Sequence, residues 1–429
     1  MIETASTHPC TGIERLINFL HDKFDGLGLG LGTVVARFDG VFDSERLREA
    51  LAKVQGRHSK LRSALVMDAT GWPCFEAVDN PPPIPLEIRR ESDPNAWTTV
   101  ALDPPPQPFP PATVPLVRLL LLEESRGRHC DLIGVFHHVI TDGPSAFSFL
   151  RDMVRFYGQP NTPLEPAPGG FGIVPEGPTK RLDQLSLGLQ FAGRIFRRKF
   201  ADVVARPPLP TDEVKSPGSV QRWVWSKEET DALVRRCHEK RTTLFGAMGA
   251  ATLAGLTRQF GWEGRTLACQ VPINVRPLIR PAVDSDVFGP FISAARLLMA
   301  PFQTGNFWEQ ARHCRPQLRD VFDRDNPLDP LRLASMIPVS PRRLPRHTAT
   351  FALNVLGRMP SIDVEDSPRL TEYSWFGKQH ISGVPLAVQV ITVSDRLNLT
   401  LRAECLSLPT VQQTGEAIQA ALRDAIQAT

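Results

Sequence analysis

The stretch FHHVITDGPSAF, residues 136–147, decides the fold, because it joins two kinds of secondary structure through a tight loop. It starts at the end of a short apolar run, which follows another apolar run over residues 114–123 and a set of turn residues; this order predicts an antiparallel hairpin. Pro144 suits the first turn of a helix, and apolar residues at helical spacing continue that helix to Gly158. The stretch therefore predicts a strand end, a loop and a helix start.

The loop carries two adjacent histidines and an aspartate. Side chains of adjacent strand residues point to opposite sides, so His137 and His138 cannot have the same role. If the loop turns back on itself, the carboxylate of Asp142 can hold an imidazole or anchor the loop through an arginine elsewhere. An imidazole that faces a cleft is a competent general base, a role commonly worth about 10²- to 10⁴-fold in rate. The residues alone leave two interpretations open, which are a general base and a buried polar cluster that closes a strand.

The sequence lacks the residue patterns of other common reaction centres. A serine triad would need a Gly-x-Ser-x-Gly elbow, which the sequence does not contain. A metal site would need a third ligand at motif spacing, and the remaining histidines form no His-x-x-x-His or His-Glu-x-x-His arrangement. Those histidines are His8, His21, His58, His129, His238, His313, His347 and His380. We therefore expect no metal site.

Length and composition are typical of a globular protein with two lobes. A chain of 429 residues exceeds the size at which a single core keeps growing, which predicts two lobes of about 200 residues each. It is 42% hydrophobic and 22% charged, and its net charge of +3 and pI near 8.5 give no reason to expect a nucleic-acid partner. In each half, strand-like runs are interleaved with helical patterns, which predicts α/β lobes with mixed sheets.

A segment rich in proline and glycine, residues 160–178, marks the boundary between the lobes. We expect an N-terminal lobe over residues 1–178, a linker over 179–217 and a C-terminal lobe over 218–429. Within the linker, the basic segment 180–204 mixes apolar residues with an Arg-Arg-Lys run, as a basic amphipathic helix does. Such a helix can pack on the body of the protein, or it can meet lipid, an acyl substrate or an acidic carrier protein.

The segment GLGLGLGTVVARFDG, residues 26–40, alternates glycine with leucine before a strand-like run. A strand built this way has one face without side chains. Two interpretations fit, which are close packing of the backbone against another element and a strand that lines a substrate channel.

The seven cysteines are scattered and form no Cys-x-x-Cys pair, which argues against a disulfide framework and for reduced thiols. The N-terminus has no basic start followed by an apolar stretch, and no window reaches the ~18 apolar residues that a membrane span needs. We therefore expect a cytoplasmic protein.

The segment HHVITDG, residues 137–143, resembles a signature, HHxxxDG, shared by several acyltransferase families. These are chloramphenicol acetyltransferase, the condensation domains of non-ribosomal peptide synthetases, the polyketide-associated acyltransferases and the wax ester synthases. Ser293 and Leu353 depart from the residues usual in condensation domains, asparagine and serine. Four more segments resemble condensation-like proteins in the expected order, namely RHSKLRSAL (57–65), VPINVRP (271–277), VFGPFIS (287–293) and FALNVLGRM (351–359).

This resemblance implies a V-shaped pseudo-dimer of two chloramphenicol-acetyltransferase-like lobes with mixed sheets. The histidine loop would lie at the interface, and a tunnel would reach it from both faces. His138 would be the general base that deprotonates the acceptor as it attacks an acyl thioester, with no covalent acyl-enzyme. The backbone N–H of Gly143, at a helix start, is a candidate to stabilise the developing oxyanion.

The same resemblance assigns structural roles to the other residues of the loop. Asp142 would point away from the tunnel and pair with an arginine, for which Arg276 is the first candidate and Arg62 the second. His137 would be a packing or hydrogen-bonding residue.

For the whole protein, we expect an acyltransferase of secondary metabolism or lipid modification that moves an acyl group from a thioester to a hydroxyl. Acyl-CoA or the phosphopantetheine of an acyl carrier protein would be a co-substrate, with no bound cofactor, and we expect a monomer. One alternative is a stand-alone condensation enzyme that forms an amide between substrates bound to peptidyl carrier proteins. Another is a non-catalytic module that recruits a partner.

Overall fold

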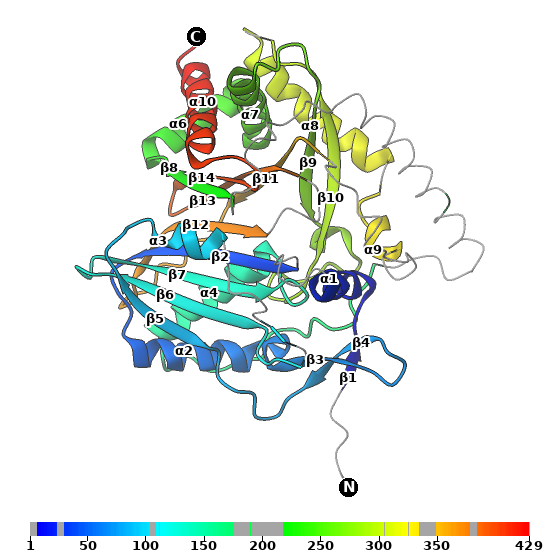
Figure 1. Cartoon of the computed structure of the whole chain (residues 1–429), viewed down its shortest axis with the longest axis vertical. Helices are drawn as coiled ribbons and strands as arrows, with labels where there is room; N and C mark the ends of the chain where they lie inside the picture. The colour runs from blue at the N-terminus through cyan, green and yellow to red at the C-terminus, as the bar shows by residue number, and fades with distance from the viewer. Residues whose placement is uncertain are drawn as a thin grey trace.

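The computed structural model describes residues 7–23, 30–102, 109–110, 112–175, 189, 218–303, 305–324, 326–333, 349–377 and 384–428. Over these ranges the chain forms two bodies of sheet and helix, one stacked on the other (Figure 1). The predicted linker, apart from Leu189, lies outside the described residues, and so does the junction at residue 178. The predicted lobe boundaries and the role of the basic segment therefore stay predictions.

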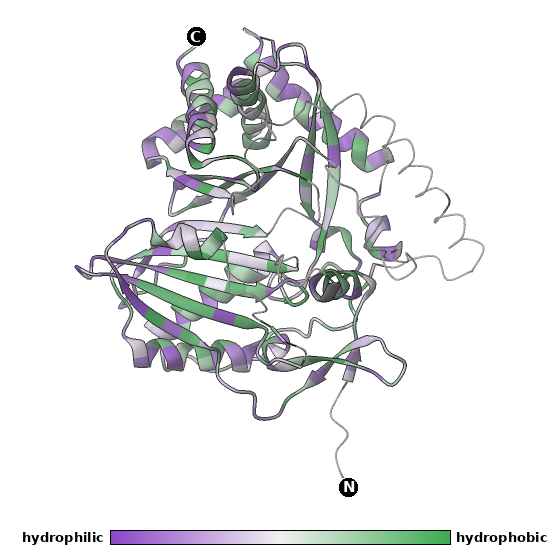
Figure 2. Ribbon diagram, in the orientation of Figure 1, coloured by the Kyte–Doolittle hydropathy of each residue, from purple (hydrophilic) through white to green (hydrophobic). Residues whose placement is uncertain are grey.

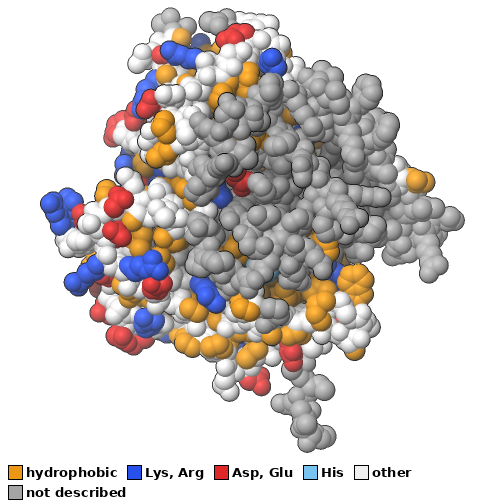
Figure 3. Space-filling view, in the orientation of Figure 1, with side chains coloured by type: hydrophobic (Ala, Val, Ile, Leu, Met, Phe, Trp, Pro, Cys, Tyr) orange, Lys and Arg blue, Asp and Glu red, His pale blue; other side chains and the backbone are white. Residues whose placement is uncertain are grey.

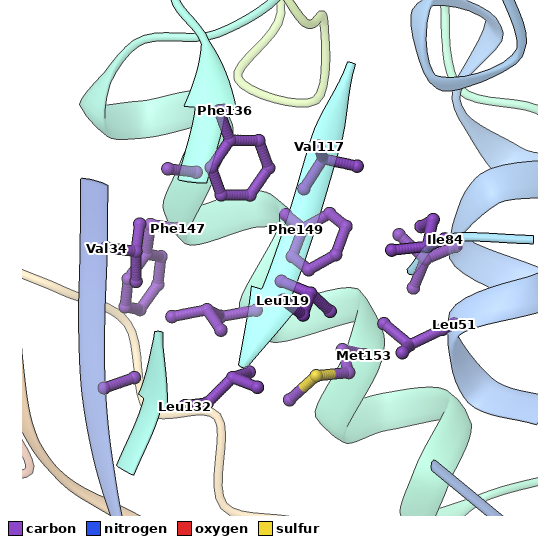
Figure 4. Packing of buried hydrophobic residues seen from close by; sticks show 14 of the residues in the cluster. Val34, Leu51, Ile84, Val117, Leu119, Leu132, Phe136, Phe147, Phe149 and Met153 are labelled. Atoms are coloured by element: carbon purple, nitrogen blue, oxygen red, sulfur yellow. The ribbon is translucent and has the colours of Figure 1, made fainter. Parts of the chain in front are cut away.

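The first body is built on a five-stranded sheet of order β12-β2-β7-β6-β5. Helices α2 and α4 pack on one face of this sheet, where Leu51, Phe149 and Met153 meet Leu119 and Leu132 (Figure 4). Figure 2 shows β6 and β7 dominated by hydrophobic residues, as expected of strands covered by helices. The elements are β2 (Leu31–Asp39), β5 (Leu86–Glu91), β6 (Val117–Glu124), β7 (His129–His137), β12 (Arg369–Gly377), α2 (Ser44–Arg57) and α4 (Gly143–Gly158).

The second body has a six-stranded sheet of order β10-β9-β11-β13-β14-β8, with helices α6, α7, α8 and α10 on its outer side (Figure 1). In this sheet β11 pairs in parallel with β9 and β13, and the other pairs are antiparallel. The elements are β8 (Ser219–Val224), β9 (Leu267–Asn274), β10 (Ile292–Met299), β11 (Phe351–Arg358), β13 (Leu386–Val393), β14 (Arg396–Ala403), α6 (Lys227–Glu239), α7 (Leu244–Phe260), α8 (Phe307–Arg324) and α10 (Leu408–Gln427).

Smaller elements complete the described chain. A three-stranded sheet of order β1-β4-β3 lies at the edge of the first body. The smaller elements are β1 (Thr7–Pro9), β3 (Ser63–Met67), β4 (Pro73–Ala77), α1 (Gly12–Lys23), α3 (Ala96–Leu102), α9 (Asp329–Leu333) and the 3₁₀ turns η1 (Ser59–Arg62) and η2 (Arg276–Leu278).

The predicted mixed α/β architecture is confirmed. Strands β6 and β7 form the predicted antiparallel hairpin, and α4 occupies the range expected from the helical spacing. Both large sheets are mixed, since β5 and β6 are parallel neighbours within the first one. Figure 3 shows basic and acidic side chains interspersed along one side of this face of the molecule, in keeping with the small net charge.

Strand β12 crosses between the bodies. It comes late in the chain, yet it pairs antiparallel with β2 from Gly377 opposite Gly32 to Arg369 opposite Asp39. Figure 1 shows it at the edge of the first sheet, on the side that faces the second body. The sheet of the first body therefore contains a strand from the range 218–429, which sequence order alone assigned to the other lobe.

The glycine-rich segment packs closely against this crossing strand. A Cβ atom added to Gly32 would lie 2.1 Å from Cη2 of Trp375, so only glycine leaves room for the indole. Gly30 has φ +86°, a conformation that glycine adopts without strain. Close packing, one of the two interpretations of this segment, is confirmed for Gly32, while residues 24–29 lie outside the described part of the chain.

Among the helices described, none is both long and apolar enough to cross a membrane.

Candidate active site

His137 and His138 are held differently at the end of β7. The side chain of His137 is buried, its Nδ1 accepts a hydrogen bond from the Val139 amide at 3.1 Å, and its ring lies 4.4 Å from that of His21. Burial lowers the pKa of His137 well below its ordinary value, so this ring stays neutral. His137 is thus the packing and hydrogen-bonding residue that the resemblance implies.

His138 is half-buried and lies just beyond the strand. Its backbone N–H donates to the carbonyl of Gly30 at 2.6 Å, and this hydrogen bond fixes the backbone at the residue that bears the ring. Nδ1 is sealed from solvent and has no hydrogen-bond partner among the described residues, whereas Nε2 is not sealed. Nε2 is therefore the ring nitrogen that is not enclosed by protein, and an imidazole that accepts a proton through Nε2 carries its own proton on Nδ1.

The ring of His138 also contacts a residue from the far end of the chain. It lies 5.8 Å from the ring of Trp375 in β12, at an interplanar angle of 79°. The histidine is therefore not enclosed within the N-terminal part of the sequence, because the strand that crosses from the second half supplies one of its neighbours.

Asp142 is the N-cap of α4 and is almost completely buried. Its Oδ1 accepts hydrogen bonds from the amide and the hydroxyl of Ser145 at 3.0 and 2.8 Å. Its Oδ2 accepts one from the amide of Phe291 at 3.1 Å. These donors lie on the helix start and on the segment before β10, so the carboxylate fixes the loop between them.

Arg276 completes this network. Its Nη1 and Nη2 donate to the two oxygens of Asp142 at 2.5 and 3.0 Å, and its side chain is only 3% exposed. Nη2 also donates to the carbonyl of Val287 at 3.0 Å, and the guanidinium lies 4.6 Å from the ring centre of Phe291. The pair expected between Asp142 and the first candidate arginine is present, and both side chains are buried.

Arg62, the second candidate, does not pair with Asp142. Its Nε is buried without a hydrogen-bond partner in the described part of the chain. Both arginines were compatible with the sequence, and the fold brings only Arg276 to the carboxylate.

Gly143 is the first residue of α4, where a backbone N–H has no acceptor within the helix. A Cβ atom added here would lie 3.5 Å from Cδ1 of Trp375 and 3.7 Å from Cδ2 of Leu356, both supplied by the second half of the sequence. The helix start therefore faces the junction of the two bodies, where its partial positive charge is available to an anion.

A second ionic network lies farther along α4, around Asp152. Asp152 in α4 accepts from His58 and Arg57, each at 2.9 Å, and from Arg151. Burial alone would raise the pKa of Asp152, but the hydrogen bond from His58 and the charge of Arg151 hold it at about 2. Burial lowers the pKa of His58 despite its carboxylate partner. Asp286 joins the network through Arg57 and Arg151, so it links α2, α4 and the segment before β10.

Sequence reasoning missed Trp375, Tyr373 and Ser145. Ser145 was accessible in principle, because a serine three residues after an N-cap aspartate is well placed to bond it. Tyr373 and Trp375 alternate along β12 and pack on α4 and on the histidine loop. Burial and the charge of Asp142 raise the pKa of Tyr373, so its hydroxyl stays protonated. Nothing local in the sequence places β12 there.

Two cavities lined by described residues lie away from His138. One of about 770 Å³ is lined by α7, α8 and α10, including Arg258, Trp308 and Ala421. A smaller one of about 210 Å³ lies between β10 and α8. The tunnel expected at His138 therefore stays a prediction. No group of three or more His, Cys, Asp or Glu in the described ranges is arranged to hold a metal ion.

Two family models match the chain. One is the condensation domain, over residues 31–171, which include the histidine loop. The other is the phthiocerol/phthiodiolone dimycocerosyl transferase C-terminus, over residues 215–402, which include Arg276 and β12. The two ranges together cover most of the chain.

Individual proteins agree with these matches. A plipastatin synthase polypeptide of Bacillus subtilis (strain 168) is 24% identical over 341 residues, which are 77% of this chain. The chain spans only 9% to 13% of the length of this relative and of two further plipastatin synthase polypeptides from the same organism.

Solved structures share the whole fold. The structure of polyketide synthase associated protein 5 from Mycobacterium tuberculosis has a TM-score of 0.69 and 16% identity, and the match covers 98% of both chains. SgcC5 from Streptomyces globisporus has a TM-score of 0.60 and 19% identity, covering 97% of this chain and 98% of that one.

The fold and the loop at its junction define a protein of the chloramphenicol-acetyltransferase-like class, built from two such lobes. More narrowly, the first half of the chain is similar to condensation domains and the second half to the phthiocerol/phthiodiolone dimycocerosyl transferase C-terminus.

Proposed function

We propose that the protein is an acyltransferase that moves an acyl group from a thioester to a hydroxyl, with His138 as the general base. The observation that carries this proposal is the arrangement of one imidazole. Its Nε2 is accessible at the junction of the bodies, and its loop is held by the buried pair of Asp142 and Arg276. A precisely held base needs such a rigid support.

The chemistry follows from these positions. Nε2 of His138 takes the proton of the acceptor hydroxyl while its oxygen bonds to the thioester carbonyl carbon. The carbonyl oxygen becomes an oxyanion, and in this proposal the N–H of Gly143 at the start of α4 stabilises it. The C–S bond then breaks, the thiolate takes the proton back from the imidazolium, and an ester and a free thiol leave. No group of the protein becomes acylated.

The comparisons support the substrate classes. Relatives named as parts of a synthase and as a polyketide synthase associated protein favour a donor thioester on a carrier protein or on coenzyme A. The SgcC5 structure contains 1-(2-naphthyl)-1,2-ethanediol, a small diol, which favours a hydroxyl acceptor. The condensation-domain match favours the second candidate, an amide-forming enzyme that uses carrier-bound substrates.

The test is mass spectrometry of products from the purified protein, with acyl-CoA and acyl carrier protein donors each offered to alcohols and to amines. Ester products that disappear in His138→Ala support the proposal. Amides formed without esters favour the condensation alternative. If no donor and acceptor react, a non-catalytic recruiting module becomes the better explanation.

A further inference from the structure

Trp375 is held rigidly on the strand that crosses between the bodies. Gln389, in β13, brackets its backbone, because Gln389 Oε1 accepts from the Trp375 N–H at 2.9 Å and Gln389 Nε2 donates to the Trp375 carbonyl. The side chain is 7% exposed. Gln389, in the sheet of the second body, thus fixes the position of Trp375 in the sheet of the first body.

The two ends of the indole have different neighbours. The six-membered ring lies on Gly32, where an added Cβ would be 2.1 Å from Cη2 and 2.5 Å from Cζ2. The five-membered ring lies at the helix start, where an added Cβ on Gly143 would be 3.5 Å from Cδ1 and 3.7 Å from Nε1. The indole N–H is therefore at the end of α4 that carries the partial positive charge.

This indole N–H has no acceptor among the described residues, and Nε1 is not sealed from solvent. Buried indole N–H groups normally find a partner. In this protein, Nε1 of Trp225 donates to Gln419 at 3.1 Å and Nε1 of Trp308 donates to the carbonyl of Ala425 at 3.2 Å. The unused donor of Trp375 lies beside His138, whose ring is 5.8 Å from the indole.

We propose that the indole N–H of Trp375 donates a hydrogen bond to the oxyanion formed when the acceptor attacks the thioester, together with the N–H of Gly143. This inference rests on the proposed function. The donor is in place before the reaction, because Gly32 and Gln389 fix the indole, and a fixed donor stabilises developing charge without reorganising. It also adds Trp375, from the second half of the sequence, to a reaction centre that is otherwise built by the first.

The test is Trp375→Phe, which keeps a large aromatic ring and removes the N–H. Losing one oxyanion donor commonly costs about 10²- to 10³-fold in kcat, so we expect a loss of about 100-fold with KM changed by less than about threefold. The matched control is Trp225→Phe, which removes an indole hydrogen bond inside the second body, and it should lower the melting temperature and leave kcat unchanged.

A second readout does not require turnover. The probe is a phosphonate with phosphorus in place of the carbonyl carbon of acetyl-pantetheine, measured by calorimetry beside the unreactive thioether. Trp375→Phe should weaken binding of the phosphonate by about 100-fold and leave thioether binding unchanged. Equal phosphonate affinity, or a kcat within twofold of the parent, would overturn the role of Trp375. Absence of acyl transfer by the parent protein would overturn the proposed function instead.

Discussion

Replacing Arg276 by methionine should destabilise the protein far more than the same change at an exposed arginine. Asp142 accepts five hydrogen bonds, of which two come from Arg276 and three from Ser145 and the Phe291 amide. Removing one partner of a buried ion pair commonly costs 3–5 kcal/mol, because the remaining charge stays buried without compensation. The three donors that remain still solvate the carboxylate, so the lower end of about 3 kcal/mol applies.

Differential scanning calorimetry at pH 7 measures this loss. At roughly 2 °C for each kcal/mol, as for large domains, the melting temperature of Arg276→Met should fall by about 6 °C. The matched control is Arg369→Met, which breaks the ion pair with Asp39 at 3.0 Å between side chains that are 64% and 55% exposed. Exposed pairs contribute about 0–1 kcal/mol, so this variant should melt within about 2 °C of the parent protein.

The double variant Asp142→Asn with Arg276→Met shows whether the buried charge is the cause. It removes the carboxylate that was left without a partner, so it should melt at a higher temperature than Arg276→Met alone. Two results would contradict this role of the ion pair. Arg276→Met could have the same melting temperature as Arg369→Met, or the double variant could melt at a lower temperature than Arg276→Met.

Three further changes test other parts of the arrangement. His138→Ala should lower kcat by about 10²- to 10⁴-fold and leave the melting temperature nearly unchanged, and an unaltered rate would reject the general base. Asp152 has a pKa of about 2, below its ordinary 3.8, so its ionised form stabilises the fold above pH 4 and this contribution is lost between pH 4 and 2. Asp152→Asn should therefore flatten the melting curve against pH in that window, and an equal slope would contradict the assignment. Gly32→Ala should displace the indole of Trp375, costing about 1–3 kcal/mol and much of the activity, whereas Gly169→Ala, with open space around it, should do neither.

Local patterns predicted the elements that carry the chemistry. The paired apolar runs predicted the hairpin of β6 and β7, and helical spacing after Pro144 predicted α4. The pairing of Asp142 with Arg276 came from the resemblance, since no local pattern links residues so far apart in sequence. Arg62 ends one short 3₁₀ turn and Arg276 begins another, so their local settings are similar. Only the tertiary structure distinguishes them, because it brings Arg276 and not Arg62 to Asp142.

The crossing strand β12 shows why the rest of the site could not be predicted from the sequence. No local pattern singled out β12, and its pairing with β2 joins positions more than three hundred residues apart, from Asp39 to Arg369. A pleated strand can pair with many partners, and its choice is fixed by what it buries, here Trp375 against Gly32. The glycine segment was recognised in the sequence, while its contact with Trp375 depends on tertiary structure.

Because β12 is shared, neither half of this protein is a separable module. A fragment that ended before residue 218 would leave β2 as an unpaired edge strand, with its backbone N–H and C=O groups exposed and without the Trp375 ring that packs on Gly32. The other fragment would carry β12 with its Tyr373 and Trp375 face bare to water. Exchange of one half between relatives would separate β2 from β12, so a functional chimera has to take both strands from the same parent.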